Sequence, residues 1–129
     1  MSAMSNYLEL KVLDHILSTT AYTMPSGIYL ALSTGSFGED ASGTELSGNA
    51  YARQGDVAFA AASGGTTSNS ANIEFPAATG SWGSVSHWAL FDASSSGNML
   101  IHGAFSAAKT ITTGDILRVN AGDLDITAA

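Results

Sequence analysis

The chain has 129 residues, with four lysines and arginines against eleven aspartates and glutamates, a net charge of −7 and no cysteine. This length predicts a single domain over residues 1–129, and the lack of cysteine excludes disulfides and thiolate metal sites. The acidic balance argues against nucleic acid and anionic membrane surfaces as partners, and no apolar run approaches the roughly 18 residues of a membrane span.

The N-terminal segment predicts one amphipathic helix. Its first residues, MSAMSNYLELK, lack the basic start and apolar run of a signal peptide, so we expect synthesis and folding in the cytoplasm of a bacterial host. Asn6 is the predicted N-cap, and Glu9 follows at the spacing of a capping box. One wide apolar face docks either on the domain's own sheet or on a partner subunit; it comprises Leu8, Leu10, Val12, Leu13, Ile16 and Leu17.

The rest of the chain predicts β structure. Pro25-Ser26-Gly27 turns the chain, which separates a helical arm over residues 1–20 from a β-sandwich over residues 27–129. Short runs rich in β-branched and aromatic residues alternate with Gly, Ser, Asn and Asp clusters, and this spacing favours an antiparallel sandwich or barrel over βαβ units. The predicted strands are Ile28–Ser33, Asp56–Ser63, Ala71–Phe75, Ser84–Ala93, Asn98–Ser106, Ile116–Asn120 and Leu124–Thr127.

Residues 84–106 predict a hairpin with a defined register. The turn is Ser94-Ser95-Ser96-Gly97, in which the glycine can adopt a positive φ. If Ala93 pairs with Asn98, Trp88 faces Gly103 and Leu90 faces Ile101. The indole then fills the space that the glycine leaves, so this face is the predicted core.

Two segments are predicted to be loops. Residues 34–49, TGSFGEDASGTELSGN, carry the acidic side chains Glu39, Asp40 and Glu45, and connections of this length are often functional. Residues 76–83, PAATGSWG, place Trp82 between glycines, where it looks exposed. Trp82 is a candidate for stacking on a sugar, although a buried or interface anchor is the favoured interpretation.

No sequence motif predicts catalysis. There is no G-x-S-x-G elbow and no G-x-x-x-x-G-K-[ST] loop. His87 and His102 share one face of the predicted hairpin and could contribute to a metal site, but no carboxylate of the hairpin shares that face. Asp123 and Asp125 lie on one side of a strand, as calcium ligands or acid–base groups do, but also as a solvent face does. We therefore predict no enzyme activity, no metal and no cofactor.

Arg53 stands alone as a cation in ELSGNAYARQG, residues 45–55. On an extended strand Tyr51 and Arg53 point the same way, and Glu45 lies just across the Ser47-Gly48-Asn49 turn. A guanidinium there can bind the Glu45 carboxylate or loop carbonyls and act as a loop clamp, because it presents five donors in a rigid fork. The alternative is a contact between subunits.

Sequence blocks along nearly the whole chain resemble a family of small tailed-phage virion proteins, often labelled tail-fibre proteins, some of which are capsid cement proteins. The blocks are SNYLELKVLDHIL, TAYTMPSGIYLALST, GTELSGNAYARQ, FAAASGGTTSNSANIEFPAATGSWGSVSHWALFDA and NMLIHGAFSAAKTITTGDILRVNAGDLDIT. The resemblance implies a jelly-roll-like β fold, a homotrimer, and a site on the capsid exterior. It offers no catalytic residue to carry over.

The sequence and the resemblance together predict a capsid cement protein. It would bind the outer surface of the major capsid protein and stabilise the shell against internal DNA pressure. The alternative is a tail or fibre component that contacts host-surface glycan. The residues predicted to touch other subunits or the capsid are Tyr7, Leu10, Leu13, Leu17, Glu39, Asp40, Glu45, Tyr51, Arg53 and Trp82.

Overall fold

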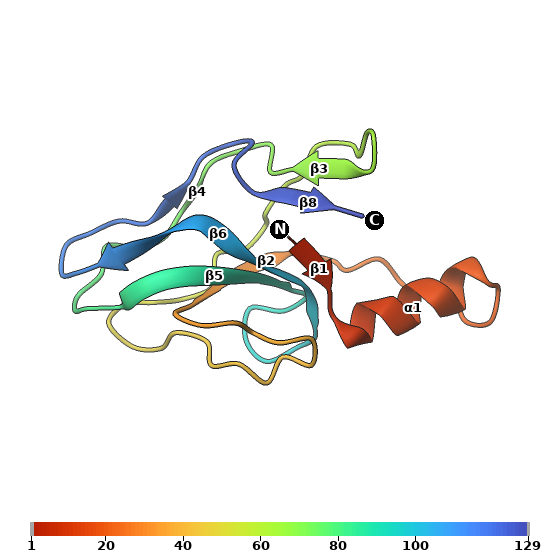
Figure 1. Cartoon of the computed structure of the whole chain (residues 1–129), viewed down its shortest axis with the longest axis horizontal. Coiled ribbons are helices and arrows are strands. Elements are labelled where there is room, and N and C mark those ends of the chain that lie inside the picture. The colour runs from red at the N-terminus through yellow and green to blue at the C-terminus, as the bar shows by residue number, and fades with distance from the viewer. Residues whose placement is uncertain (1, 129) are drawn as a thin grey trace.

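The computed structural model describes residues 2–128 (Figure 1). Between these bounds the chain forms one helix and eight strands. In chain order they are β1 (Ser2–Met4), α1 (Asn6–Ile16), β2 (Tyr29–Ser33), β3 (Thr66–Ser68), β4 (Ile73–Glu74), β5 (Gly83–Phe91), β6 (Met99–Ile111), β7 (Arg118–Val119) and β8 (Asp125–Thr127). The prediction of a mainly antiparallel β fold with one N-terminal helix is confirmed.

A four-stranded antiparallel sheet in the order β1-β6-β5-β2 forms the centre of the fold. The register predicted for its central hairpin is confirmed from His87 to Leu90, where Trp88 lies opposite Gly103 and Leu90 lies opposite Ile101, and it shifts on either side of this stretch. β1 was not predicted from the sequence, because its three residues Ser-Ala-Met carry no β-branched or aromatic side chain. This strand fixes the N-terminus to the edge of β6.

The β5–β6 pairing contains a bulge close to its turn. The predicted pairing of Ala93 with Asn98 is wrong, because β6 carries one extra residue, Leu100, between two aligned pairs. The carbonyl of Leu100 instead accepts a hydrogen bond from the backbone N–H of Ser5, at 2.8 Å between N and O. The bulge therefore supplies the point at which the chain passes from β1 into the helix.

Two small sheets cover one face of the central sheet (Figure 1). They are β4–β7 and β3–β8, each of two strands, so the second layer is smaller than the first. The strand predicted over residues 56–63 is wrong: this segment makes only isolated bridges, through Phe59 and Ser63. Asp56 at its start adopts a φ of 55°, which interrupts an extended run.

The core lies on both faces of the central sheet. The main cluster fills the space between the sheet and the two small sheets, and the second cluster lies under the long loop 34–49. The main cluster contains Leu30, Leu32, Ile73, Phe75, Ala78, Trp82, Val85, Trp88, Leu90, Ile111, Leu117, Val119 and Leu124. The second contains Ala31, Phe37, Ala89, Phe91 and Met99.

The helix begins one residue away from the expected cap. Ser5, not Asn6, is the N-cap, and its Oγ accepts a hydrogen bond from the backbone N–H of Leu8 at 3.2 Å. Ser5 is buried and its hydroxyl also donates to the carbonyl of Met99, so a hydrogen bond joins the N-cap to β6 of the central sheet. Pairing of β1 up to Met4 makes Ser5 extended, which sets the boundary.

Beyond its first turn, α1 projects away from the sheets (Figure 1). None of its residues is buried, and Leu10, Leu13, Ile16 and Leu17 are 55% to 70% exposed. Docking of the apolar face on the domain's own sheet, one of the two predicted arrangements, therefore holds only for Leu8 and Val12, which are half-buried, and is wrong for Leu10, Leu13, Ile16 and Leu17. The chain forms the helix while leaving most of the face that its sequence pattern implies exposed.

Candidate functional site

The arrangement around Arg53 confirms the predicted loop clamp. Its Nε and Nη2 atoms donate to the two carboxylate oxygens of Glu45, at distances of 2.8 Å to 3.2 Å. The Arg53 side chain is 8% exposed and the Glu45 side chain 24% exposed, so the pair is largely removed from water. A buried pair of this kind stabilises only when its remaining donors are also satisfied.

The remaining nitrogen of Arg53 supplies those contacts from a distant part of the chain. Nη1 donates to the carbonyls of Ala93 and Ser96, at 2.9 Å and 2.8 Å, in the turn between β5 and β6. The guanidinium also lies 3.8 Å from the ring centroid of Phe91. One side chain thus ties loop 34–49 to the hairpin turn, and these partners, about 40 residues away, could not be identified from local sequence.

Tyr51, two residues before Arg53, completes the clamp from an irregular segment that belongs to no strand. Its hydroxyl donates to Glu45 Oε2 at 2.5 Å and accepts from the backbone N–H of Leu32 at 3.0 Å. Burial, followed by the hydrogen bond to Glu45, raises the pKa of Tyr51 far above the ordinary tyrosine value. The phenol therefore stays protonated and keeps donating to the carboxylate throughout the physiological pH range.

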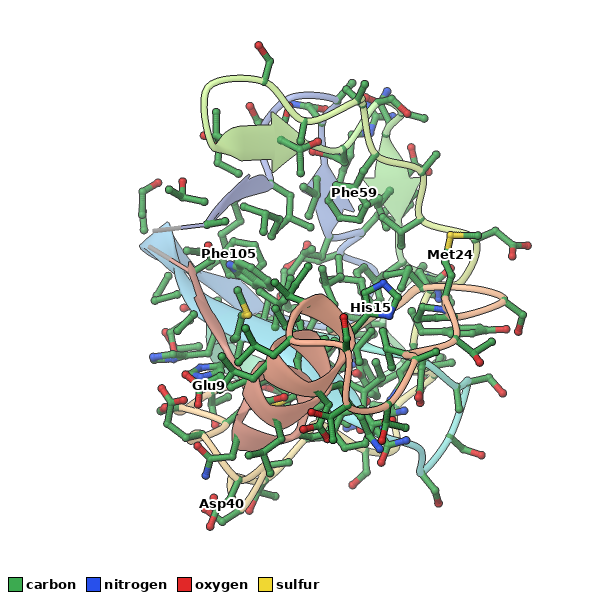
Figure 2. All side chains as sticks on the ribbon, turned by 90° about the vertical axis from the view of Figure 1, so that its right-hand side faces the viewer. Glu9, His15, Met24, Asp40, Phe59 and Phe105 are labelled. Carbon is green, nitrogen blue, oxygen red and sulfur yellow. The ribbon has the colours of Figure 1, made fainter. Side chains whose placement is uncertain are left out.

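The clamp holds an acidic loop in a fixed conformation. Phe37 of this loop is buried in the second core cluster, and Ser33 Oγ donates to the carbonyl of Thr44 at 2.6 Å. Glu39 and Asp40 lie exposed at its outer side (Asp40 is labelled in Figure 2). Hydrogen bonds from Ser42 lower the pKa of Asp40, which keeps this carboxylate ionised.

Trp82 lies inside the domain, as the favoured interpretation of a buried or interface anchor allows, and it is not exposed as its glycine neighbours suggest. The side chain is 5% exposed, packs edge-on against Tyr51 and Phe75, and donates its indole N–H to the carbonyl of Asn49 at 2.9 Å. Its flanking glycine, Gly80, lies against the Asn49 side chain, where a Cβ would come within 2.6 Å. The ring therefore cannot stack on a sugar at the surface.

Large apolar side chains are exposed at one end of the molecule, on α1 and after it, away from the clamp. Of the large apolar side chains that are more than half exposed among residues 2–128, all but Ile116 lie on α1 or shortly after it. They are Leu10, Leu13, Ile16, Leu17 and Met24, with exposures of 65%, 55%, 69%, 70% and 84%. Tyr7 is half-buried at the base of the helix, where Lys11 lies 5.5 Å from its ring centroid.

The candidate metal and acid–base residues are not assembled into a reactive group. His87 contacts Ser86 Oγ at 2.7 Å, and His102 Nε2 lies 3.4 Å from Glu39, a carboxylate that the hairpin alone did not reveal. Asp123 and Asp125 are exposed. Among residues 2–128, no three His, Asp or Glu side chains converge as metal ligands would.

Comparison with known proteins identifies a phage family. A family model described as Podophage GP4 fiber I protein gp80 matches residues 3–127, which is nearly the whole chain. No curated protein matches the sequence. Within residues 2–128, the helix lacks the length and apolar character needed to cross a membrane.

Proposed function

The chain belongs to the Podophage GP4 fiber I protein gp80 family of phage structural proteins, and on this premise we propose that it is a structural subunit of a phage tail fibre. Its role is to hold a position in the particle through contacts with other chains, and it requires no chemical reaction. The family description refers to a fibre, so it favours the fibre over the capsid surface as the location.

The observation that carries the proposal is the exposed apolar face of α1. Contiguous exposed apolar surface on a folded domain marks an interaction site, because water contact with it is unfavourable and association removes that contact. Leu10, Leu13 and Leu17 were predicted to contact a subunit, and all three are more than half exposed. The proposed attachment surface is therefore α1, with Tyr7 at its base.

The clamp braces the domain from which the attachment helix projects. Glu45, Tyr51 and Arg53 make their contacts within the chain, so their proposed role is to brace the acidic loop rather than to touch a partner. Glu39 and Asp40 are exposed on that loop and are available as a charged rim. Charged residues at a rim set orientation and partner choice more than affinity.

A capsid cement protein is the second candidate, favoured by the resemblance of the sequence blocks to small virion proteins that include cement proteins. In that role the same helix would face the major capsid protein. A homotrimer is the expected assembly unit in both roles, and native mass spectrometry of the purified chain tests it. The two roles differ in where the chain lies and how many copies a particle holds.

Counting and locating the chain in purified phage particles tests the proposal. We expect a small number of copies per particle relative to the major capsid protein, with gold-labelled antibody at the tail. Hundreds of copies spread over the head would transfer the assignment to a cement protein. Absence of the chain from purified particles would contradict both.

A further inference from the structure

A pocket of about 420 Å³ lies between the second half of β6 and the segment 117–125, which carries β7 and leads into β8. Trp88 and Leu124, two buried residues of the main core cluster, contribute to its apolar lining. Phe105 of β6, which is labelled in Figure 2, is half-buried and lines the pocket as well. All of the lining residues lie between 85 and 125, apart from the clamp and from α1.

A bulge in β6 shapes one wall of this pocket. Four residues of β6, 105–108, stand opposite one residue of β5, Ser86. The aligned pairs that flank them are Val85 with Lys109 and His87 with Ala104. Extra residues on one strand bend that strand and redirect its side chains, and such bulges often lie beside binding sites. Phe105, Ser106 and Ala107 of the bulge all line the pocket.

Opposite charges line the pocket without pairing. Lys109 lines it from β6, and Asp123 and Asp125 line it from the segment that leads into β8. All three are exposed, and within residues 2–128 none of them takes part in a salt bridge. Arg118 in the same pocket pairs with Glu74. The pocket therefore offers one ammonium donor and two carboxylate acceptors that have no charged partner in the described part of the chain.

This lining excludes several classes of ligand. A wholly apolar ligand would take the ammonium and the carboxylates out of water without hydrogen bonds, which is unfavourable. A simple anion would meet the two carboxylates, and like charges repel. A metal cation needs more ligands, and among residues 2–128 no third His, Asp or Glu joins Asp123 and Asp125.

A neutral molecule with many hydroxyls satisfies every part of the lining. Its hydroxyls donate to carboxylates and accept from an ammonium, so both signs of charge are used. A ring that presents C–H groups on one face also covers apolar surface such as Phe105 and removes it from water. Saccharides combine these properties, and the volume of about 420 Å³ lies within the usual range of small-molecule sites.

On the basis of the proposed fibre function, we propose that this pocket binds one unit of a neutral saccharide, with surface polysaccharide as its source. Phe105 contacts the ring face, Asp123 and Asp125 accept hydrogen bonds from the hydroxyls, and Lys109 donates one. Figure 1 shows α1 at the right-hand end of the molecule and the end of β6 at the left-hand end. Attachment through α1 and saccharide binding therefore use different parts of the surface.

Titration of the full chain with sugars, followed by two-dimensional amide NMR spectra, tests the site. The probes are D-glucose, D-galactose and N-acetyl-D-glucosamine at up to about 100 mM, because a ligand held by a few hydrogen bonds binds in the millimolar range. At least one sugar should give saturable shifts of residues 105–109 and 123–125 with a single dissociation constant. The amides of α1 serve as the internal reference and should not shift.

A charge-removing variant tests the named residues. Asp125→Asn keeps the size of the exposed side chain but removes its charge, so the dissociation constant should rise about fivefold, because hydrogen bonds to an ionised acceptor are stronger. The matched control is Asp14→Asn, an exposed carboxylate on α1, which should leave the dissociation constant unchanged. Equal effects of the two variants would overturn the assignment, and thermal melts verify that both are folded.

Two further probes decide between ligand classes and sources. Glycine, a zwitterion, should not reproduce the shifts; if it does so and the sugars do not, the pocket is a site for charged ligands and the proposal is overturned. The hexasaccharide of the sugar that binds should bind more tightly than the free sugar, and equal affinity would overturn a polysaccharide as the source.

The inference and the fibre function can fail separately. Lack of saturable shifts with all three sugars overturns the saccharide site, whereas detection of the chain at the tail of purified particles would leave the fibre function standing. Sugar binding by a chain that is absent from the particles would support the site and contradict the fibre function.

Discussion

The clamp around Arg53 and the apolar face of α1 differ in whether their side chains find partners within the chain. At the clamp, a charged side chain in an acidic, small-residue segment is enclosed and has every nitrogen bonded within the chain. On α1, apolar side chains stay in water although the domain has a core only a few residues away. A completed contact network indicates a role inside the domain, and an incomplete one indicates a role between molecules.

Substitutions in the two regions should affect different properties of the protein. Substitution at the clamp should reduce the free energy of unfolding of the isolated chain. Substitution on α1 should leave that free energy almost unchanged and affect association instead. The following predictions run from the largest expected effect on stability to the smallest.

Removing the clamp carboxylate should be the most destabilising change. Glu45→Ala leaves the Arg53 guanidinium, whose side chain is 8% exposed, without its anionic partner. We expect the free energy of unfolding to fall by about 3 kcal/mol and the midpoint of thermal unfolding by about 10 °C. Thermal and urea unfolding followed by circular dichroism check this, and a midpoint within a degree or two of the unaltered chain would show that the pair is not stabilising.

Arg53→Lys should show that the guanidinium shape matters and not its charge alone. A lysine ammonium cannot bond Glu45 and the Ala93 and Ser96 carbonyls together, so we expect a loss of about 1–2 kcal/mol. The matched control is Arg118→Lys, whose guanidinium pairs with Glu74 where both side chains are about half exposed. That control should cost less than about 0.5 kcal/mol, and equal losses at both sites would contradict the clamp.

Tyr51→Phe should cost about 1 kcal/mol and change the response to alkaline pH. The pKa of Tyr51 is raised in the folded chain, so its contribution to stability is complete below the unfolded pKa of about 10 and declines as pH rises above it. The Phe variant should lose that part of the decline. Unfolding curves at pH 8 and pH 10.5 measure the difference, and identical pH dependence in both chains would refute it.

Replacing exposed leucines on α1 should have the smallest effect on the isolated chain. Leu13→Gln with Leu17→Gln keeps good helix formers and removes apolar surface that is already in water, so the free energy of unfolding should change by less than about 0.5 kcal/mol. Dilute thermal unfolding measures stability, and sedimentation measures mass at higher concentration. A large loss of stability in the dilute monomer would mean that the face is buried within the chain.

Much of the central sheet could be predicted because its signals are local. Alternation in β5 and β6, a serine-glycine turn and the placement of Trp88 opposite Gly103 predict the register at the centre of the hairpin from the sequence alone. The bulge at Leu100 was not predictable, since it depends on the chain passing from β1 into α1. For the same reason the prediction of Asn6 as the N-cap is wrong. Ser5, the residue directly after β1, is the N-cap.

The contacts at the candidate sites could likewise be predicted only where the partners lie close together in the sequence. The pairing of Arg53 with Glu45 could be predicted because eight residues and one turn separate them. The partners of Trp82 could not, because its glycine neighbours resemble an exposed loop and its hydrogen-bond partner, Asn49, lies 33 residues away. The helical period identified the apolar face of α1, but only the fold could show that the face lies beyond the sheet.

Hydrogen–deuterium exchange of the helix in free and assembled protein tests the central claim most directly. The backbone amides of residues 6–17 are measured in the dilute chain and in intact phage particles, with the β5–β6 hairpin as the internal reference. We predict fast exchange of the helix in the dilute chain and strong protection in the particle, with little change in the hairpin. Equal exchange of the helix in both states would contradict the claim that α1 is the attachment surface.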